Sequence, residues 1–412
     1  MADKDSDQII VMKFGGSSVA DAQHIKNVAK IAISEKERGK SVVVVVSAMG
    51  KTTDGLIKLA AEVTDNPPVR EIDMLLSTGE QVSIAMLAMT IEAMGYKAKS
   101  MTGWQVGIKT DAEHTRAKIL NVRDKVMREE LRDGNILIVA GFQGITEDGE
   151  ITTLGRGGSD LTAVALAAAL KADCDIYTDV DGVYTCDPRI VPNARKLDII
   201  SYDEMLELAS LGAKVLHSRC VEVAKKFNVP LQVRSSFHPD VLGTKVIKEV
   251  KEMEDIVVSG VAFNRNVAKI SVLGVPDKPG IAANLFTVLG EAGIIIDLII
   301  QNVSRDNIND ISFTVSIDDL KRAMDVLEKF KNENSAARIV ADNEVAKLSV
   351  VGVGMKSHAN VAATMFQALA ENNINIENIG TSEIKVSVLI REKDLDKAVR
   401  AIHEKFNLSE GH

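Results

Sequence analysis

Residues 8–18 carry the sequence QIIVMKFGGSS, in which an apolar run is followed by two glycines and two serines. The run Gln8–Phe14 predicts a β-strand, and the glycines predict a tight turn into a helix that begins near Ser18. Ser17 or Ser18 suits the N-cap, because a hydroxyl oxygen accepts a hydrogen bond from a free backbone N–H of the first turn. Such N–H groups also bind phosphate oxygens, and Lys13 would add a positive charge beside them. The pattern alone supports a phosphate-binding loop and an ordinary strand–helix turn equally.

The same alternation of short apolar strands and longer helices continues to about residue 245. Val42–Val46 is a continuous β-branched run, which is typical of a strand buried on both faces of a parallel sheet. Ile136–Val139 and Cys174–Thr178 predict two further strands, and the Ala- and Leu-rich segment Leu161–Leu170 predicts a buried helix between them. Together they predict an α/β domain with a mostly parallel sheet sandwiched by helices.

An internal repeat begins after residue 247. Lys269–Val275 (KISVLGV) aligns with Lys347–Val353 (KLSVVGV), and each copy predicts the order strand, helix, strand, strand, helix. This is the order of a ferredoxin-like βαββαβ unit. The first copy ends on a predicted strand near Arg338–Ala341, whereas the second copy has no such final strand. We therefore expect the strand-like segment at 256–263 (IVVSGVAF) to complete the second unit, so that the two units interlock.

Composition excludes several classes of protein. Of the 412 residues, 46% are hydrophobic and 26% are charged, as in a globular protein of several domains. Residues 1–247 carry 30 basic against 34 acidic residues and residues 248–412 carry 19 against 24, so the net charge of −9 is spread along the chain. This distribution disfavours a nucleic-acid or anionic-membrane partner. No secretory signal or membrane-spanning run is visible, and the cysteines Cys174, Cys186 and Cys220 fit neither a disulfide framework nor a metal site. The sequence predicts a reduced, cytoplasmic protein.

The sequence at Gly50 resembles the end of a P-loop but lacks the rest of that motif. Gly50–Thr52 matches the last residues of GxxxxGK[ST], but the first glycine of that motif would stand at Val45. The chain is therefore not a P-loop nucleoside triphosphatase. Ser47 and Thr53 still follow a buried strand, where open α/β sheets bind ligands. A Ser/Thr-rich turn that caps the next helix explains them equally well.

Three further motifs combine charges with glycines or hydroxyls. Ser77–Gln81 (STGEQ) puts Glu80 near a predicted helix start, where it could cap the helix or hold an ammonium group. Gly155–Asp160 (GRGGSD) puts Arg156 between glycines at the head of a helix, which suits bidentate binding of a carboxylate or phosphate. Tyr177–Arg189 gathers hydroxyls, carboxylates and one arginine in a loop after a strand, a pattern that is also common in solvated turns.

The histidines predict no catalytic or metal-binding arrangement. None of the seven stands at metal-ligand or triad spacing, and we interpret His217, in a predicted helix, as structural. Glycine-rich loops at three strand ends, together with Lys13 and Arg156, favour electrostatic catalysis of phosphoryl transfer over covalent or metal-hydrolytic chemistry.

Together these segments resemble the aspartate kinases of the amino-acid-kinase superfamily, over nearly the whole chain. The motifs that carry the resemblance are KFGGSS at 13–18, VVSAMGKTTDGL at 45–56, STGEQ at 77–81, TLGRGGSD at 153–160 and YTDVDGVYTCDPR at 177–189. The repeated units resemble tandem ACT domains, with QNVS at 301–304 and NIGTSEIKVSVLI at 378–390. The implied domains are a kinase domain at 1–247, a first ACT region at 248–342 that donates strand 256–263, and a second ACT domain at 343–412.

The resemblance implies ATP-dependent phosphorylation of the β-carboxylate of L-aspartate to 4-phospho-L-aspartate, the first step toward lysine, threonine and methionine. Mg²⁺ would be carried mainly by the nucleotide phosphates rather than by a protein metal site. The catalytic residues would be Lys13 and Asp160. ATP would contact Lys13, Gly15, Gly16, Ser17, Thr178, Asp179, Tyr184, Arg189 and Lys214. Aspartate would contact Ser47, Thr53, Glu80 and Arg156.

The ACT-like repeats imply feedback control by threonine, lysine or both. Effector-binding positions carried over from the family are Asp277, Gly280, Ala282, Gln301, Asn302, Asn375, Ile376 and Ser382. The family also implies a homodimer associated through ACT units, and some relatives make a separate regulatory subunit from an internal start, for which Met253 is placed. An acetylglutamate or glutamate 5-kinase and a non-catalytic amino-acid sensor are the alternatives. The ACT-like tail argues against the first, and intact Lys13, Glu80, Arg156 and Asp160 argue against the second.

Overall fold

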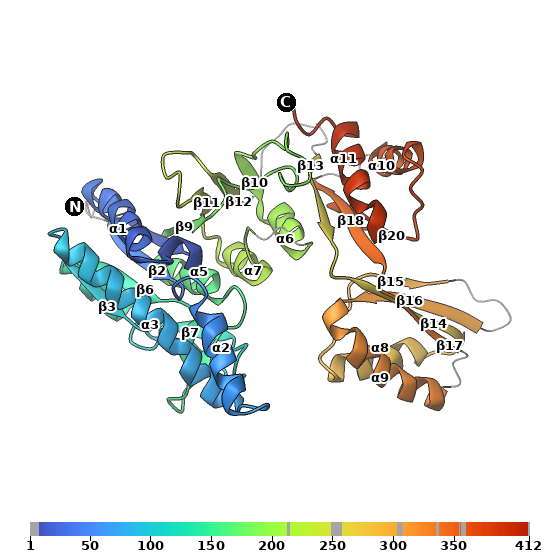
Figure 1. Ribbon diagram of the computed structural model, residues 1–412, viewed down its shortest axis with the longest axis horizontal. Helices are drawn as coiled ribbons and strands as arrows, with labels where there is room; N and C mark the ends of the chain where they lie inside the picture. The colour runs from blue at the N-terminus through green and yellow to red at the C-terminus, as the bar shows by residue number, and fades with distance from the viewer. Residues whose placement is uncertain are drawn as a thin grey trace, which may run out of the picture. The chain divides into compact units, whose positions relative to one another are not determined.

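The computed structural model (Figure 1) describes residues 8–211, 215–248, 258–302, 308–334, 338–353, 355 and 360–410. The chain divides into two compact units. The first comprises Met1–Val183, Lys196–Ser210 and Lys214–Met253. The second comprises Tyr184–Arg195, Leu211–Ala213 and Glu254–His412, so it includes a short segment from the middle of the kinase-like sequence.

An eight-stranded sheet forms the centre of the first unit, in the order β10-β12-β11-β9-β1-β2-β6-β3. Its strands are β1 (Ile9–Phe14), β2 (Ser41–Val46), β3 (Ala98–Met101), β6 (Ile136–Ala140), β9 (Asp173–Thr178), β10 (Ile199–Ser201), β11 (Leu231–Ser235) and β12 (Thr244–Ile247). Every pair is parallel except β11 with β12. The expected α/β fold with a mostly parallel sheet is thus confirmed.

Helices cover the sheet because its central strands are apolar on both sides. All six residues of β2 are buried. On one face, side chains of β1, β2 and β6 form a core with α1 (Ala22–Glu37) and α3 (Val69–Ala93). α5 (Gly158–Leu170) packs on β1, β2 and β9 and contacts α7 (Ser218–Phe227). Alternate strand residues therefore face different helices. The remaining helices are α2 (Thr52–Val63), α4 (Lys125–Arg132) and α6 (Tyr202–Ser210).

The first helix begins later than the sequence predicts. Residues Gly16–Val19 form a 3₁₀ turn, η1, and α1 starts only at Ala22. Asp21 is its N-cap, since the Asp21 carboxylate accepts hydrogen bonds from the backbone N–H groups of Gln23 and His24. The prediction of Ser17 or Ser18 as the N-cap is therefore wrong, because the Asp21 Oδ1 atom, three residues after Ser18, accepts both N–H groups at the helix start.

The STGEQ motif lies within a helix rather than at its start. α3 spans 25 residues, and Ser77–Gln81 occupies its third and fourth turns. The expected helix-capping role of Glu80 is therefore wrong. α3 alone among the described helices is long and apolar enough to cross a membrane by length and composition, and it packs against α1, β3, β6 and β8. Asp73, Ser77, Glu80 and Ser83 are buried along it.

A small sheet that the sequence did not predict lies beside α3. It has the order β5-β4-β7-β8, from β4 (Ile108–Thr110), β5 (Ile119–Val122), β7 (Gln143–Ile145) and β8 (Ile151–Thr153). Strands of three or four residues carry too little periodicity to stand out in a sequence. β8 contacts α3 and ends two residues before Gly155, so this sheet determines where the GRGGSD loop begins.

Two four-stranded sheets build most of the second unit. The first, β15-β16-β14-β17, contains β14 (Ala268–Pro276), β15 (Ile299–Gln301), β16 (Ile308–Val315) and β17 (Arg338–Asp342), with α8 (Ile281–Glu291) and α9 (Ile317–Asn334). The second, β13-β18-β20-β19, contains β13 (Val258–Asn264), β18 (Val345–Gly352), β19 (Asn378–Thr381) and β20 (Lys385–Arg391), with α10 (Asn360–Glu371), η3 (Glu392–Asp394) and α11 (Leu395–Lys405). The expected ferredoxin-like arrangement is confirmed, and β13 pairs antiparallel with β18, as the interlocked arrangement requires.

The inserted segment Tyr184–Arg195 packs into the second of these layers. Cys186 and Val191 join the core formed by β13, β18, β20, α10 and α11. The Arg400 Nε atom donates to the carbonyl of Ile190 over 3.1 Å. A stretch of the kinase-like sequence is therefore built into the regulatory-type sheet.

Candidate active site

Glycine- and hydroxyl-bearing loops meet at one edge of the large sheet. β9, β1, β2 and β6 are adjacent and parallel, so their carboxyl ends point the same way. Gly15 follows β1, Ser47 follows β2, Gly141 follows β6 and Thr178 ends β9. Ligands of open parallel sheets bind at this edge. The candidate site therefore lies where the sequence motifs converge.

Lys13 and Asp160 form an ion pair at the centre of this edge. The Lys13 Nζ and Asp160 Oδ1 atoms are 2.6 Å apart, and the two side chains are only 12% and 13% exposed. Asp160 lies in the first turn of α5, beside the last residues of β1. The carboxylate thus holds the ammonium group of Lys13 in a largely buried position, close to the backbone of Gly15.

The loops after β1 and β2 touch each other through Gly16. A Cβ atom at Gly16 would lie 2.9 Å from the carbonyl oxygen of Ala48, a separation that real side chains essentially never show. The Gly50 N–H donates to the Gly16 carbonyl over 3.0 Å. Glycine is therefore required here by close approach of two backbones, and backbone N–H groups stay accessible to an anion.

Glu80 presents a buried carboxylate to the loop after β2. Its Oε1 atom accepts a hydrogen bond from the Ala48 N–H over 3.1 Å, and Glu80 is 3% exposed. Its Oε2 atom is buried and has no hydrogen-bond partner among the described residues. Burial raises the pKa of Glu80 to about 7, against smaller lowering effects of backbone hydrogen bonds at Glu80 and Ala48. A buried acceptor without a partner is costly, so this oxygen suits a cationic ligand.

Arg156 stands exposed between two glycines with left-handed backbone conformations. Gly155 and Gly157 both have φ of 74°, a region that favours glycine. At Gly157 a Cβ atom would also lie 2.4 Å from the Cβ and Cγ atoms of His217. The side chain of Arg156 is consequently carried on a turn that only glycines permit, and its guanidinium faces solvent.

His217 lies beside the turn that carries Arg156, and its expected place inside a helix is wrong. It has an extended backbone and immediately precedes α7 as the N-cap residue. Its Nδ1 atom is buried without a hydrogen-bond partner among the described residues. Burial lowers the pKa of His217, the nearby Asp160 opposes that shift, and Arg219 and Arg156 assist it. No spacing in the sequence signals this placement, because Gly157 and His217 are sixty residues apart and meet only through the fold.

The remaining predicted kinase residues are distributed over both units. Ser47 and Thr53 are half-buried, and Thr53 lies in the first turn of α2. Ser17 is exposed in η1, Thr178 is half-buried and Asp179 is exposed. Tyr184 and Arg189 belong to the second unit, where Arg189 is exposed and ion-paired with Asp187 over 2.6 Å. Lys214 lies outside the described residues, as does Met253.

A cavity of about 330 Å³ lies in the first ACT-type repeat. Four predicted effector residues line it: Asp277, Gly280, Ala282 and Gln301. Asn309 also lines it; its Nδ2 atom donates to Asp277 over 2.9 Å, while its buried Oδ1 atom has no partner among the described residues. The other four predicted effector residues do not line this cavity: Asn302, Asn375, Ile376 and Ser382.

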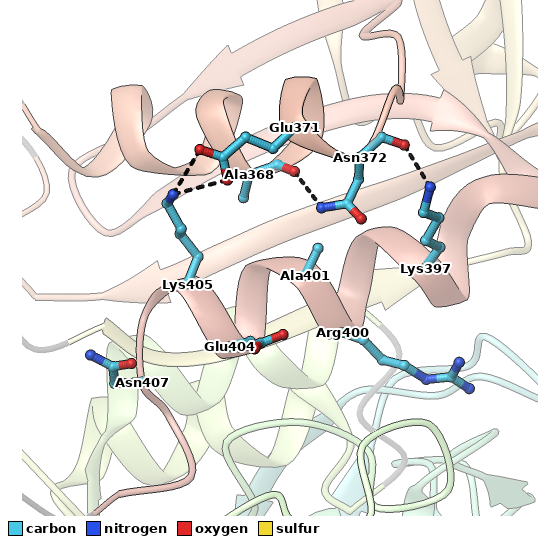
Figure 2. Close-up of a pocket in the computed structure, with 9 residues that line it drawn as sticks. All are labelled: Ala368, Glu371, Asn372, Lys397, Arg400, Ala401, Glu404, Lys405 and Asn407. Carbon is cyan, nitrogen blue, oxygen red and sulfur yellow. Dashed lines mark hydrogen bonds and ion pairs between the residues drawn. The ribbon is translucent and has the colours of Figure 1, made fainter.

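A second cavity of about 510 Å³ lies between α10 and α11 (Figure 2). Two of the lysines that line it already have partners. Lys405 pairs with both carboxylate oxygens of Glu371 at 3.0 Å, and Lys397 donates to the backbone carbonyl of Asn372 over 2.7 Å. None of the predicted site residues lines it.

Comparison with known proteins identifies the family. A family model described as the amino acid kinase family matches residues 8–235, and two ACT domain models match residues 270–332 and 348–406. An aspartokinase of Mycolicibacterium smegmatis is 52% identical over 406 residues, covering 97% of this chain and 96% of the relative. The chain belongs to the aspartokinase family. An aspartate kinase of Pseudomonas putida is likewise 52% identical over 401 residues, covering 97% of this chain and 98% of the relative.

Solved aspartokinases have the same fold. Aspartokinase III of E. coli, solved in complex with aspartate and ADP, matches with a TM-score of 0.82 at 26% identity, over 97% of this chain and 99% of that one. The aspartate kinase of Clostridium acetobutylicum matches with a TM-score of 0.75 at 25% identity, over 97% of this chain and 100% of that one. The expected membership of the aspartate kinases with tandem ACT domains is confirmed.

Proposed function

We propose that this aspartokinase transfers the γ-phosphoryl group of ATP to the β-carboxylate of L-aspartate, giving 4-phospho-L-aspartate and ADP. One observation carries the proposal: the Lys13–Asp160 ion pair, the unpartnered Glu80 oxygen and the exposed Arg156 guanidinium gather around the loops at one edge of the sheet. Lys13 offers a cation to a phosphoryl group. Glu80 and Arg156 offer opposite charges to the two ends of an α-amino acid.

The chemical difficulty of this reaction is charge repulsion. The β-carboxylate of aspartate, with an ordinary pKa of about 3.9, is already ionised at neutral pH, so no general base is needed. The attacking carboxylate and the ATP phosphates repel each other. Lys13, held by Asp160, offsets that repulsion together with the backbone N–H groups of Gly15, Gly16 and Ser17.

The substrate residues divide according to the ends of aspartate. Ser47 and Thr53 hold the β-carboxylate end toward the phosphoryl group. Glu80 pairs with the α-ammonium group, and Arg156 clamps the α-carboxylate. The nucleotide contacts Thr178, Asp179, Tyr184 and Arg189, and Lys214 reaches it as well.

Mg²⁺ accompanies the nucleotide in this proposal and neutralises phosphate charge when bound. The described residues contain no group of three or more His, Cys, Asp or Glu side chains arranged to hold a metal ion. The site therefore fits a Mg²⁺ ion whose main ligands are phosphate oxygens and water. The Asp160 carboxylate is engaged with Lys13.

A pathway amino acid, threonine or lysine or both, regulates the enzyme through the cavity of the first repeat. The cavity suits a zwitterion. Asp277 and the unpartnered Asn309 Oδ1 atom can accept an ammonium group, and the N-terminus of α8 beside Gly280 can accept a carboxylate. Asn302 belongs with this surface, and Asn375, Ile376 and Ser382 form the opposing one.

The further parts of the proposal concern assembly. The catalytic domain covers 1–247, the first ACT region 248–342 and the second ACT domain 343–412. The protein acts in the cytoplasm as a homodimer associated through its ACT units, and neither nucleic acid nor a membrane is a partner. An internal start at Met253 would yield a regulatory subunit made of the ACT units.

Substitution of the two cations tests the catalytic proposal. Lys13→Ala should lower kcat by about 10²–10³-fold, because one preorganised donor to the developing charge is lost. Arg156→Ala should raise the KM for aspartate at least tenfold. ADP release is measured in a coupled assay with aspartate, glutamate and N-acetylglutamate as acceptors, and only aspartate should support turnover.

Two exposed cations outside the site provide matched controls. Lys30 lies in α1 and Arg132 in α4, and both side chains are exposed. Lys30→Ala and Arg132→Ala should retain normal kinetics. Near-normal turnover of Lys13→Ala or Arg156→Ala, in folded protein, would refute the assignment. Turnover with glutamate or N-acetylglutamate instead of aspartate would reassign the substrate, and no turnover with any acceptor would favour a sensor.

A further inference from the structure

Asp73 is a fully buried carboxylate to which no role has so far been given. It lies on α3 with an exposed fraction of 0%. The Thr115 N–H lies 3.1 Å from Oδ1 and 3.0 Å from Oδ2, the His114 Nδ1 atom lies 2.8 Å from Oδ2, and the Thr153 hydroxyl donates to Oδ1. A buried carboxylate is tolerated only when such donors surround it. All of its partners come from the loop before β5 and from the end of β8.

These partners flank the turn that carries Arg156. Thr153 is the last residue of β8, and the Ala117 N–H donates to its carbonyl over 2.9 Å. A Cβ atom at Gly155 would lie 2.9 Å from the Thr115 carbonyl oxygen, so the Thr115 backbone borders the glycine before Arg156. The Asp73 carboxylate therefore binds both segments that support this turn.

Arg219 joins the same two segments from the other end. Its NH1 atom donates to the Leu154 carbonyl over 2.6 Å, and its NH2 atom donates to the Ala117 carbonyl over 3.0 Å. Arg219 binds backbone only, whereas Asp73 ties the segments to α3. Asp73 thus links the turn to α3 by hydrogen bonds, in addition to the packing of β8 on that helix.

The same helix carries Glu80. Asp73 and Glu80 are seven residues apart, which is two helical turns and about 10 Å along the axis, and both belong to the buried face of α3. We propose that Asp73 is a positioning residue that fixes Arg156 at the distance from Glu80 required to bind the α-ammonium and α-carboxylate groups of one amino acid. This inference rests on the proposed roles of Glu80 and Arg156 and adds the residue that sets their spacing.

Asp73→Asn is the sharpest test, because it changes charge and one acceptor while keeping shape. The Thr115 N–H donates to both oxygens of Asp73, so the amide NH₂ would oppose this N–H on either side and loosen the turn. A misplacement of about 1 Å can cost up to 10²-fold in an active site. We expect the KM for aspartate to rise about tenfold or more, with the KM for ATP within twofold of the parent.

A double-mutant cycle with Arg156→Ala separates positioning from general damage. If Asp73 acts through Arg156, the double variant should bind aspartate no more weakly than Arg156→Ala alone. Additive increases in KM overturn the inference while leaving the role of Arg156 intact. A normal KM in Arg156→Ala refutes the proposed role of Arg156 and the inference with it. An equal rise in the KM for ATP also overturns the inference.

Thr153 supplies a second pair of variants should Asp73→Asn not fold. Thr153→Val removes one donor to Asp73 with nearly the same volume, and Thr153→Ser keeps the hydroxyl. The valine variant should raise the KM for aspartate about threefold, and the serine variant should restore it. Equal KM values in the two variants would contradict a positioning role.

Discussion

The two repeats of the second unit have the same strand order but close their sheets with different strands. The orders β15-β16-β14-β17 and β19-β20-β18-β13 correspond strand for strand. Each repeat also has a pair of serine hydroxyls in contact between neighbouring strands. The hydroxyls of Ser271 and Ser312 are 2.8 Å apart, and those of Ser349 and Ser387 are 2.7 Å apart. β17 follows the last helix of its own repeat, whereas β13 precedes the whole first repeat. The local pattern determines a strand position without determining which segment fills it.

Reciprocal ion pairs show how this exchange couples the repeats. Lys269 of the first repeat pairs with Glu377 of the second over 3.4 Å, and Lys347 of the second pairs with Asp297 of the first. Lys269 and Lys347 are equivalent positions of the repeat. The side chain of Lys347 is 3% exposed, so its partner carboxylate compensates a buried charge. The repeats therefore form one regulatory body.

The repeats differ in what they hold. The first has an open cavity at Asp277–Ala282. The second uses β13 and α11 to hold the segment Tyr184–Arg195, chiefly at Thr185. The Thr185 carbonyl accepts the Val261 N–H over 2.7 Å, and its hydroxyl lies 2.9 Å from the His403 Nε2 atom. The cavity lined by predicted effector residues thus belongs to the first repeat, whereas the second repeat anchors a stretch of the kinase sequence.

The largest predicted effect is that of a substitution at Gly260 in β13. A Cβ atom there would lie 2.8 Å from the Thr185 carbonyl oxygen, a backbone atom that cannot move alone. Gly260→Ala should therefore destabilise the protein by about 1–3 kcal/mol through overpacking. Its control is Gly290→Ala in α8 of the first repeat, where a Cβ atom meets nothing within 4 Å. That variant should gain up to about 1 kcal/mol from helix propensity.

Urea unfolding followed by circular dichroism measures both glycine variants. Hydrogen exchange of peptides from β13 and β18 should rise in Gly260→Ala and stay unchanged in Gly290→Ala. Equal unfolding midpoints for the two variants would show that the contact between β13 and Thr185 does not stabilise the protein. That result would contradict the anchoring role of the second repeat.

Asn309 tests the proposed role of the cavity in the first repeat. Asn309→Ala removes the acceptor proposed for the effector ammonium group, and the concentration of threonine or lysine that gives half-inhibition should rise about tenfold, or about 1.4 kcal/mol. The control is Asn372→Ala, which alters the cavity of the second repeat shown in Figure 2. Each amino acid is titrated separately in the ADP-release assay. Equal shifts in both variants would place the effector elsewhere, and uninhibited activity of both should remain normal.

Much of the fold and part of the site could be predicted because their signals are local. Strand–helix alternation marked β1, β2, β6 and β9, and charges close to paired glycines marked Lys13 and Arg156. The rest depends on contacts between distant residues. Asp73 meets donors that lie 41 to 80 positions away, and nothing near it in the chain distinguishes it from an ordinary helix carboxylate. The position of His217 beside Gly157 was not predicted for the same reason. In the sequence, Thr185 is one of several hydroxyl-bearing residues in an acidic loop. Only the fold shows that β13 and α11 surround it.

His403 carries the smallest predicted effect and tests the anchor by pH. The first repeat, from Ala268 to Asp342, contains no histidine. Burial lowers the pKa of His403, so the folded protein holds it neutral against Thr185. A depressed histidine pKa means that the unfolded chain binds the proton first, so stability falls as pH drops through about 6.5. For one such histidine the loss between pH 7 and pH 6 is at most about 0.7 kcal/mol.

His403→Gln keeps a hydrogen-bonding side chain and removes the titration. Urea unfolding at pH 7 and pH 6 should therefore show a smaller acid loss in the variant than in the parent. Glu80, whose raised pKa of about 7 gives the opposite trend, is present in both proteins and cancels in the difference. An unchanged pH dependence would mean that His403 is protonated or solvated in the folded protein. The contact of a buried, neutral His403 with Thr185 would then not be the feature that distinguishes the second repeat from the first.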